Sequence, residues 1–368
     1  MPAAIHQLLP TLGYGDAIGN HVLALQALLR AWGYRSEIYA ERWHPKLADV
    51  CRPYTEYHRV QHADNLALLH YSIGGEINDF AQSLPDRVLL YYHNITPAHY
   101  FYRFNGELAR QLQQARTALS RLATRFPAIA ASSYNASELL AMGFQVLGVA
   151  PYLVRFDDLD AGKQSTGAAT IRARYGECSG KTWLYIGRLA PNKCIHDVIT
   201  AFYYYHTWMQ PDSRLLLVGT GEGLEPYVDD LYRLVTRLGL DGAVAFAGHH
   251  GAADGLAVFY DLAHVYVSMS EHEGFCIPLV EAMHYDVPVV AHAATGVPDT
   301  MGDAGILIKQ KHPAVIAEII HELLCAPELH AAILAGQRAR LDAFAPARTQ
   351  AALQSVLAQV GVVARETA

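Results

Sequence analysis

The chain has 368 residues, of which 52% are hydrophobic and 17% charged, so it has ample apolar surface to bury in globular domains. This composition excludes disordered, collagen-like and coiled-coil proteins. The formal net charge of −7 argues against DNA or RNA as a partner, because nucleic-acid binding requires a basic surface. At about 150 residues per domain, the length predicts two domains.

The five cysteines are scattered, with no CxxC pair and no Cys/His ligand spacing. The sequence therefore predicts neither a disulfide framework nor a structural zinc site, and it favours a reducing compartment. The N-terminal residues lack a basic segment followed by a long apolar run, and no uncharged apolar run approaches ~18 residues. We expect a cytoplasmic protein.

Short apolar runs alternate with helical patterns twice along the chain, which indicates two parallel sheets built from βαβ units. Residues 155–170, between the two halves, are small, polar and charged, as is typical of a linker. We predict an α/β fold with domains at 1–160 and 161–345, and a helix within 346–368 that extends the second domain or crosses back to the first. The strands are expected at 4–9, 36–40, 67–71, 88–93 and 128–132, and then at 182–187, 214–219, 243–248, 264–269, 287–292 and 305–308.

The most informative stretch is SMSEHEGFCIPLVEAMHYDVPVVAH, in which a strand, a loop and a helix starting near Pro278 are expected. Main-chain N–H groups around Phe275 and Cys276 would point out of the carboxyl edge of the sheet, where open α/β folds bind phosphate. Glu273 and Glu281 are suited to accept hydrogen bonds from sugar or ribose hydroxyls. The alternative is that each glutamate only stabilises the helix dipole.

A second stretch is LYIGRLAPNKCIHDVI, in which Arg188 follows a strand and Lys193 is expected in the first turn of a helix capped by Asn192. A cation there opposes the helix dipole by ~0.3–1 kcal/mol unless an anion lies beside it. Arg188 and Lys193 can hold a diphosphate and stabilise it as it leaves. A surface salt-bridge pair is the alternative. The glycines of LLLVGTGEGLEPY alone indicate only a tight turn.

Four motifs in this order resemble family-4 glycosyltransferases of the GT-B fold: Gly187-Arg188 with Lys193, the VGTGEG turn, Glu273-Gly274-Phe275 with Glu281, and the TGVPD turn. These are retaining enzymes that use nucleotide-sugar donors. The match is densest over residues 183–308, and weaker N-terminal signals extend it over most of the chain. The resemblance implies two Rossmann-like domains facing across a cleft, with the nucleotide mainly on the C-terminal side.

The resemblance also implies roles for single residues. Arg188 and Lys193 match the pair that neutralises the diphosphate in place of a metal, Glu273 matches the glutamate close to the donor sugar, and Glu281 matches the one that holds the ribose. Cys276 departs from the glycine usual at its position, and Asp299 stands where the family often has glutamate. The other donor-binding residues implied are Gly15, Asp16, Gly187, Gly221, His249, Gly274, Phe275, Cys276 and Leu279.

The N-terminal half would supply the acceptor side. The loop TLGYGDAIGNH resembles the Gly-rich loop that approaches donor phosphate and acceptor, and an ordinary turn before a helix is its alternative. His93 resembles the histidine that donates a hydrogen bond to the reacting sugar, and a buried core histidine is its alternative. The acceptor candidates are Asn20, Ser72 and Tyr102, with core packing as the alternative for the aromatic segments near the last two.

Two further patterns have a functional and a plain interpretation. Asp158 and Asp160 have the DxD form that binds a metal in other glycosyltransferases, but their expected place in a linker predicts no metal. The helix ELARQLQQARTALSRLATRF carries Arg110, Arg121 and Arg125 on the face opposite its leucines. That face is either solvated or makes peripheral contact with anionic lipid at the inner side of a membrane.

We therefore expect a retaining hexosyltransferase that needs no metal or other cofactor. It would move a sugar from a nucleoside-diphosphate sugar to a hydroxyl of a glycan, lipid-linked or small-molecule acceptor, in polysaccharide or glycoconjugate biosynthesis. A GT-B nucleotide-sugar epimerase, which would turn over its donor without an acceptor, is one alternative. A non-catalytic nucleotide-sugar-binding scaffold is the other.

Overall fold

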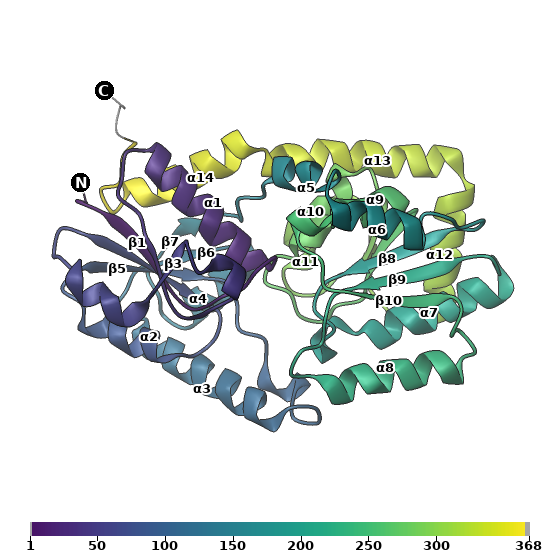
Figure 1. Cartoon of the computed structure of the whole chain (residues 1–368), viewed down its shortest axis with the longest axis horizontal. Helices are drawn as coiled ribbons and strands as arrows, with labels where there is room; N and C mark the ends of the chain where they lie inside the picture. Colours follow the sequence, from purple (N-terminus) through teal and green to yellow (C-terminus); the bar gives the residue numbers. More distant parts are fainter. Residues whose placement is uncertain (1, 365–368) are drawn as a thin grey trace. The chain divides into compact units, whose positions relative to one another are not determined.

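The computed structural model describes residues 2–364, and this part of the chain divides into two compact units. Unit 1 is formed by the described residues of Met1–His99, Glu107–Val154 and Ala343–Ala368, and unit 2 by Tyr100–Gly106 and Arg155–Asp342. Each unit is a parallel sheet with helices on both faces (Figure 1). The predicted fold class, an α/β protein with two Rossmann-like units, is confirmed.

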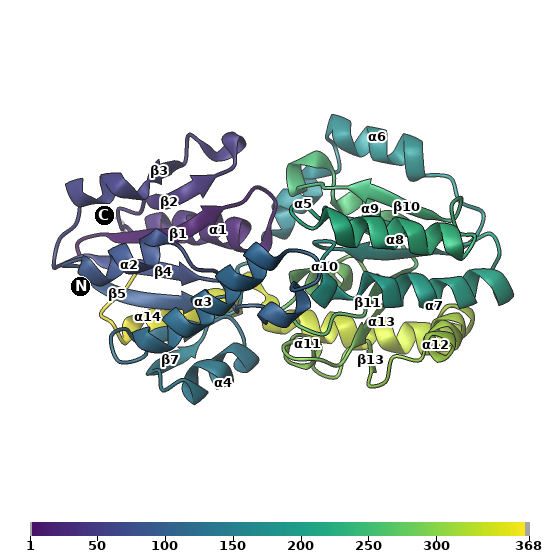
Figure 2. The same cartoon turned by 90° about the horizontal axis from the view of Figure 1, so that it is seen from below.

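Unit 1 has a seven-stranded sheet with the order β3-β2-β1-β4-β5-β6-β7. Helices α1 and α14 cover one face and α2 and α3 the other (Figures 1 and 2). Strand β4, with the sequence LALLHY, is buried along its whole length, as expected in a parallel sheet covered on both faces. The elements are β1 (Ile5–Leu12), α1 (Ala17–Ala31), β2 (Ile38–Trp43), β3 (Cys51–Pro53), β4 (Leu66–Tyr71), α2 (Glu76–Phe80), β5 (Arg87–Tyr92), α3 (Gly106–Leu122), β6 (Ala128–Ala130), α4 (Ser133–Ala141), β7 (Val146–Val149) and α14 (Pro346–Ala358).

Unit 2 has a six-stranded sheet with the order β10-β9-β8-β11-β12-β13. Helices α5, α6, α9 and α10 pack on one face around a continuous apolar core, and α7 and α8 lie on the other (Figure 1). The elements are α5 (Phe156–Gly162), α6 (Thr166–Tyr175), β8 (Thr182–Ile186), α7 (Ile195–Trp208), β9 (Arg214–Val218), α8 (Glu225–Arg237), β10 (Val244–Gly248), α9 (Ala257–Leu262), β11 (Val265–Ser268), α10 (Ile277–His284), β12 (Val289–His292), α11 (Val297–Met301), β13 (Ile306–Ile308), α12 (Pro313–Cys325) and α13 (Pro327–Leu341).

Every strand predicted from the sequence is present, with ends shifted by a few residues. The prediction missed β3 and β7, which are short, and β7 is only partly buried along its length. Its interior Gly148 also breaks the apolar pattern that indicates a strand.

Residues 155–170 are not a linker, contrary to our prediction. They contain α5 and the start of α6, and Ser165 caps α6 by accepting from Ala168 N at 3.0 Å. Composition misled because Ser, Gly and Thr are also common where one helix ends and another begins. The chain leaves unit 1 after Val154, a few residues before the predicted boundary.

The C-terminal helix belongs to unit 1. After Asp342 the chain returns to unit 1, where α14 packs against β7. Gln359 Nε2 donates to Leu147 O at 2.9 Å, and Tyr34 OH donates to Val363 O at 2.8 Å. Of the two arrangements considered for this helix, the structure has the one in which it crosses back.

Among the described residues, no single helix is both long and apolar enough to span a membrane. Helix α12 and the helical region Pro327–Ala358, bent by 95° where they meet, reach the required length and composition only as a pair.

Candidate nucleotide-sugar site

The predicted donor residues lie on two loops that follow neighbouring strands of unit 2. Strands β8 and β11 are adjacent in the sheet, although the chain passes through β9 and β10 between them. Strand order therefore reverses at this point, which is where doubly wound sheets bind their ligands. We call residues 187–194, after β8, the cation loop and residues 269–276, after β11, the glutamate loop.

Glycines allow the cation loop to pack against the turn that follows β9. Gly187 and Gly219 have φ values of 150° and 148°. A Cβ on Gly219 would collide with the carbonyl oxygen of Gly187, and a Cβ on Gly221 would collide with the side chain of Val228. Packing is thus sufficient to explain Gly219 and Gly221 of the VGTGEG turn, and Gly223 has a positive φ of 74°.

Asn192 does not cap a helix, contrary to our prediction. Pro191–Lys193 form a 3-10 helix, and α7 begins only at Ile195. Because a proline opens this tight turn, Lys193 precedes α7 instead of lying in its first turn. The Asn192 side chain donates to the main-chain oxygen of His272 at 3.1 Å. Asn192 therefore joins the cation loop to the glutamate loop.

The two loops meet in a buried ion pair. Lys193 Nζ lies 2.6 Å from Glu273 Oε2, and the two side chains are only 22% and 8% exposed. Burial alone would lower the pKa of Lys193, but the Glu273 carboxylate outweighs this effect and the pKa is raised. The Thr295 hydroxyl accepts from Glu273 N at 2.7 Å and donates to Glu273 O at 2.9 Å, which fixes the backbone of the glutamate. The ion pair is therefore held from both its side chains and its main chain.

Arg188 supplies a second cation near this pair. Its Nη2 donates to the main-chain oxygen of Glu222, in the turn after β9, at 3.1 Å. Burial lowers the pKa of Arg188, but a guanidinium remains charged in proteins. Its charge is close enough to Lys193 to lower the pKa of that lysine. Arg188, Lys193 and Glu273 together carry net positive charge, which suits a phosphate ligand.

Glu281 lies on α10 and is 7% exposed. Its Oε2 accepts from Tyr260 OH at 2.6 Å. Burial raises the pKa of Glu281 to about 7, and the hydrogen bond from Tyr260 acts in the opposite direction. The carboxyl group can therefore change its charge near neutral pH.

The start of α10 brings main-chain groups to the glutamate loop. Cys276 caps the helix in the left-handed conformation with φ 74°. Phe275 O accepts from Thr300 Oγ1, and Leu279 N donates to Cys276 O at 3.2 Å. Leu279 is fully buried, so its side chain packs in the core. Of the predicted donor residues here, Phe275 and Cys276 lie in the glutamate loop and Leu279 lies beneath it.

The remaining predicted donor residues of unit 2 lie on loops at the same edge of the sheet. Gly274 is in the glutamate loop, and its carbonyl oxygen lies so close to Gly296 that a Cβ on Gly296 would collide with it. Gly221 follows β9, and the exposed His249 follows β10. Because β10 is an edge strand, two places from β8, His249 is the predicted donor residue that lies furthest from β8 in strand order.

In unit 1, the predicted Gly-rich loop serves helix α1. Asp16 caps α1, with its Oδ1 accepting from Gly19 N at 2.6 Å, and Gly15 has φ 72°. This geometry fits the ordinary turn before a helix that we considered as the alternative, and contact of the loop with donor or acceptor stays a prediction. Asn20 is exposed on α1, and Ser72 follows β4, the neighbour of β1 in the sheet. These loops flank the reversal of strand order in unit 1.

Both ring nitrogens of His93 are engaged inside unit 1. Nε2 lies 2.8 Å from His70 Nδ1, and Nδ1 lies 3.0 Å from Tyr152 OH. His70 Nε2 in turn lies 2.9 Å from Gln7 Oε1, while Gln7 Nε2 donates to Val22 O at 2.9 Å. His93 is thus buried and hydrogen-bonded, as in the alternative we considered. A hydrogen bond from its ring to a sugar stays a prediction.

This chain of contacts fixes the proton positions. Gln7 can only accept at Oε1, so His70 carries its proton on Nε2 and accepts at Nδ1. His93 then donates from Nε2 and accepts from Tyr152 OH at Nδ1. His93 and His70 thus have the same tautomer, with the proton on Nε2. The side-chain amide of Gln7, two hydrogen bonds away from His93, determines this tautomer.

Burial keeps these histidines neutral. It lowers the pKa of His21 to about 3 and lowers those of His70 and His93 well below 6.5. His21 Nδ1 accepts from Leu153 N at 3.1 Å, and the ring lies edge-on to that of His93 with centroids 5.7 Å apart. We call His21, His70 and His93 the histidine cluster.

Tyr102, an acceptor candidate, belongs to unit 2, with the segment Tyr100–Gly106, and is 64% exposed. In this segment Arg103 Nη2 lies 3.0 Å from Asp230 Oδ2 on α8. A cavity of about 440 Å³ lies beside the segment, with Phe104 and Tyr227 in its wall. None of the predicted donor residues lines this cavity, although Pro191 of the cation loop does.

The DxD pattern lies on helix α5 and not in a linker. Asp158 Oδ1 lies 2.9 Å from Arg155 Nη2, and Asp160 Oδ1 accepts from Tyr285 OH at 3.1 Å. The two carboxylates are thus paired with groups of the protein. The linker position from which we predicted no metal is therefore wrong, and the absence of a metal stays a prediction.

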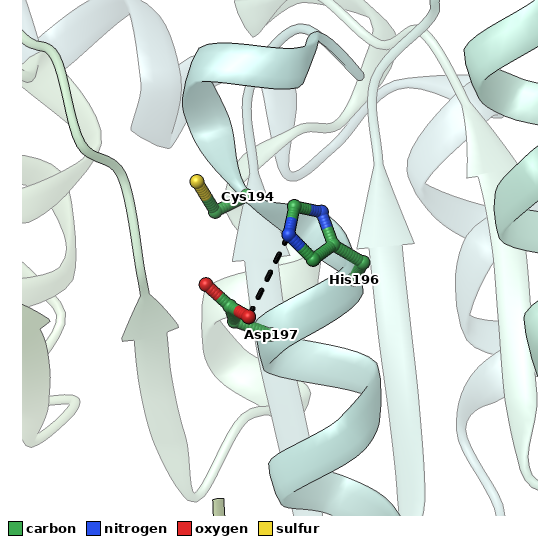
Figure 3. Close-up of side chains that lie close together, drawn as sticks. All are labelled: Cys194, His196 and Asp197. Carbon is green, nitrogen blue, oxygen red and sulfur yellow. Dashed lines mark ion pairs between the residues drawn. The ribbon is translucent and has the colours of Figure 1, made fainter. Parts of the chain in front are cut away.

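Cys194, His196 and Asp197 form a group of potential metal ligands that the sequence analysis passed over (Figure 3). Their ligand atoms lie within 4.8 Å of one another. However, Lys311 Nζ lies 2.8 Å from Asp197 Oδ2 and 2.8 Å from Glu271 Oε1. The ammonium group also lowers the pKa of the Cys194 thiol, although burial raises that pKa to about 11 overall. A lysine thus supplies the positive charge that a metal would bring.

Helix α3 ends at Leu122, so Arg125 lies beyond it and not on its face as predicted, and two of the three predicted arginines have contacts within the protein. Arg110 Nη2 lies 2.6 Å from Glu107 Oε2, and Arg125 Nη2 donates to Gln82 O at 3.1 Å. These contacts are those of a solvated face, and the lipid interpretation stays a prediction.

Sequence reasoning missed several residues that hold the site. Thr295 fixes the backbone of Glu273, and it lies in the TGVPD motif, where its hydroxyl was the available signal. Tyr260 hydrogen-bonds to Glu281 from a different helix, and no sequence pattern links the two. Gln7 and Tyr152 likewise come from distant segments.

Comparison with known proteins places residues 170–340 in a described family. This segment matches the sequence model of "Glycosyl transferases group 1". O-antigen chain mannosyltransferase B of Escherichia coli is 34% identical over 142 residues, which are 38% of this chain and 36% of that protein. GDP-mannose-dependent alpha-(1-6)-phosphatidylinositol monomannoside mannosyltransferase of Mycolicibacterium smegmatis is 29% identical over 244 residues, 63% of this chain and 62% of that protein. The chain thus aligns with between about a third and two thirds of these relatives.

Solved structures match over nearly the whole chain. Anabaena HepE in complex with UDP-glucose has a TM-score of 0.74 at 20% identity and covers 97% of this chain and 100% of its own. Sucrose-phosphate synthase of Thermosynechococcus elongatus has a TM-score of 0.71 at 18% identity, with 97% of each chain covered. The two units have the GT-B fold of these proteins, and residues 170–340, which contain the paired cations and glutamates, match the model of glycosyl transferases group 1.

Proposed function

We propose that this protein is a retaining glycosyltransferase that moves a hexose from a nucleoside-diphosphate sugar to a hydroxyl of a glycan, lipid-linked or small-molecule acceptor. The observation that carries the proposal is the buried Lys193–Glu273 ion pair, with Arg188 beside it, where strand order reverses in unit 2. The family match over residues 170–340 and the names of the relatives, which include mannosyltransferases, support it.

Arg188 and Lys193 bind the diphosphate and stabilise the negative charge that grows on it as the glycosidic bond breaks. Preorganised cations in a water-poor site are effective for this purpose, because they need no reorientation during the reaction. Main-chain N–H groups at the start of α10 add donors to the phosphates. In this proposal two side-chain cations supply the charge that a metal provides in other transferases.

The two glutamates have different tasks. Glu273, held by Lys193, lies near the donor sugar and accepts hydrogen bonds from its hydroxyls. Glu281, with Tyr260, holds the ribose hydroxyls. The acceptor oxygen bonds to the anomeric carbon on the face from which the diphosphate departs, and the departing phosphate takes the hydroxyl proton. No side chain is assigned as a nucleophile.

The acceptor would be held mainly by unit 1. The acceptor candidates Asn20 and Ser72 lie at the start of α1 and directly after β4, and these segments flank the reversal of strand order there. In this arrangement unit 2 keeps the nucleotide and unit 1 selects the hydroxyl.

A lysine substitution tests the proposal. With GDP-mannose and UDP-glucose as probes, the wild-type protein is expected to hydrolyse or transfer from at least one of them. Lys193→Ala should lower kcat by about 10²–10³-fold, as expected for the loss of one charge-stabilising group, and weaken binding of the nucleoside diphosphate much less. Lys163→Ala is the matched control, because Lys163 is equally exposed and paired with Asp261 in the same unit. Unchanged turnover in Lys193→Ala would refute the mechanism.

The same assay separates the alternatives. An epimerase would convert the donor into an isomeric nucleotide sugar without an acceptor. A non-catalytic scaffold would bind the nucleotide sugar, which raises the unfolding midpoint by mass action, but would release neither sugar nor nucleoside diphosphate.

A further inference from the structure

Lys311 joins the two loops of the candidate site from a third segment. It lies between β13 and α12, and β13 is two places from β11 in the sheet. Its Nζ is 2.8 Å from Asp197 Oδ2 and 2.8 Å from Glu271 Oε1. Asp197 is in the first turn of α7, just after the cation loop (Figure 3), and Glu271 is in the glutamate loop. We call these two ion pairs the Lys311 bridge.

The Lys311 bridge differs from an ordinary surface salt bridge. The Lys311 side chain is 14% exposed, less than that of Lys193 at 22%. Burial acts to lower the pKa of Lys311, but the two carboxylates outweigh this effect and the pKa is raised. Burying a charged group costs free energy that the attraction to its partners only offsets, so such a bridge adds little net stability. Its consequence is that the two loops are held in one arrangement.

The main chain of the glutamate loop is held at three successive residues. Glu271 N donates to Asn192 O at 2.9 Å, and Asn192 Nδ2 donates to His272 O at 3.1 Å. Thr295 Oγ1 accepts from Glu273 N at 2.7 Å. The Lys311 bridge holds the side chain of Glu271, the first of the three residues. A displacement of Glu271 would therefore be passed along the main chain to Glu273.

The Lys311 bridge does not use the ammonium group that we assign to the diphosphate. Lys193 Nζ, 2.6 Å from Glu273 Oε2, also links the two loops. A phosphate oxygen bound to Lys193 would compete with Glu273 for this ammonium group. The Lys311 bridge has its own cation and its own carboxylates, so it keeps the loops together while Lys193 exchanges one partner for another.

We propose that Lys311 is a positioning residue, which holds the glutamate loop against the start of α7 and so keeps Glu273 in place while Lys193 binds the diphosphate. The effect on turnover rests on the proposed function. The contact between the loops is a property of the protein without substrate, so the proposal and the proposed function can fail separately.

Amide hydrogen exchange tests the contact without any activity. In Lys311→Met, exchange at Glu271 N and Glu273 N should be several-fold faster than in the wild-type protein, whereas β11 should keep its protection. Lys309→Met is the matched control and should change neither amide, because Lys309 is exposed on the same segment between β13 and α12. Unchanged exchange at both amides in Lys311→Met would overturn the proposal, whether or not the protein turns over a nucleotide sugar.

Kinetic measurements with GDP-mannose and UDP-glucose test the effect on the reaction. Lys311→Met should lower kcat by about tenfold, because Glu273 is misplaced, and change KM for the donor much less, because Arg188 and Lys193 still hold the diphosphate. Lys311→Arg retains a cation that can pair with both carboxylates, so it should restore most of kcat. Equal kcat in Lys311→Met and Lys309→Met, or no gain from Lys311→Arg, would refute the proposal.

A second substitution keeps the test valid if Lys311→Met lowers the unfolding midpoint. The Glu271 side chain is 44% exposed, so Glu271→Ala should leave the fold intact and still lower kcat. The double variant with Lys311→Met should lose little more than Lys311→Met alone, because both substitutions break the same contact. Additive losses would refute the bridge as their common cause. The predicted exchange in a protein that turns over neither donor would uphold the contact and refute the proposed function.

Discussion

Both units bury polar side chains where their strand order reverses, but they stabilise these side chains in different ways. In unit 2, Lys193 and Glu273 form an ion pair, and this contact raises the pKa of the lysine. In unit 1, His70 and His93 stay neutral because burial disfavours their charged forms and a chain of hydrogen bonds satisfies their nitrogens. The same doubly wound arrangement thus holds an ion pair in one unit and neutral, hydrogen-bonded rings in the other.

The difference matters because a buried ion pair is poor evidence of stabilisation. The desolvation of such a pair costs about as much free energy as the attraction between its charges returns. The Lys193–Glu273 pair is therefore better explained by binding of a ligand than by stabilisation of the fold. A neutral cluster has no such cost at pH 7, but it becomes costly once protons are forced onto it. The two units should therefore respond differently to pH, and this contrast can be measured.

The largest expected effect is loss of stability in unit 1 on acidification. Unfolded His21 takes a proton near pH 6.5, whereas burial lowers the pKa of folded His21 to about 3. Between these values the unfolded state binds more protons, so the free energy of unfolding falls as the pH falls, by on the order of 4 kcal/mol for this residue. Amide hydrogen exchange, corrected for its intrinsic pH dependence, should show β1, β4 and β5 losing protection between pH 6.5 and 4.

A substitution makes the test specific to the cluster. His21→Gln retains an acceptor for Leu153 N and cannot be protonated, so it should reduce the pH dependence of unit 1 by the share of this residue and leave that of His70 and His93. His44→Ala, at an exposed position in the same unit, should leave it unchanged. If β8 and β11 lose protection in parallel with β1 in the wild-type protein, the contrast between the units is wrong.

In unit 2 we expect a smaller change in the free energy of unfolding, which falls as the pH rises instead of as the pH falls. Burial raises the pKa of Glu281 to about 7, above the value of 4.5 for an unperturbed glutamate. Neutral Glu281 therefore contributes to the free energy of unfolding fully below pH 4.5. This contribution is lost as the pH rises towards 7, because the glutamate of the unfolded state releases its proton at a lower pH than that of the folded state. The loss is on the order of 3 kcal/mol. Glu281→Gln should therefore increase protection of the unit 2 amides at pH 8 and change it little at pH 4.

Nucleotide binding sharpens this second prediction. If ribose hydroxyls donate to the ionised carboxylate, the affinity for a nucleoside diphosphate should rise between pH 6 and 8, and Glu281→Gln should remove that rise. Tyr260→Phe deletes the hydrogen bond that lowers the pKa of Glu281, so it should shift the rise to higher pH. Titration calorimetry at several pH values measures this directly. A pH-independent affinity in the wild-type protein would contradict the assignment of Glu281 to the ribose.

The sequence predicted the sheets better than the contacts within the site. Buried parallel strands are continuous apolar runs, so all strands except the short β3 and β7 were visible, and motif order brought Arg188, Lys193, Glu273 and Glu281 to one edge. The contacts of these residues depend on side chains distant in sequence, as with Tyr260 and Glu281, and no local pattern encodes them. Helix starts were the weakest point, because Asn192 and Ser165 are both good capping residues and only Ser165 caps a helix.

The smallest predicted effect concerns a charge in unit 1 that serves the fold. Asp16 caps α1 through Gly19 N, so Asp16→Ala should lower the free energy of unfolding by about 1 kcal/mol. Asp16→Ser keeps a capping oxygen without the charge and should restore most of that stability, which urea unfolding of both variants can measure. If Asp16 also contacts donor or acceptor, Ser will restore stability but not turnover. If Asp16→Ser recovers stability and turnover equally, unit 1 uses the charge of Asp16 only as a helix cap, and the charges that act on the substrate lie in unit 2.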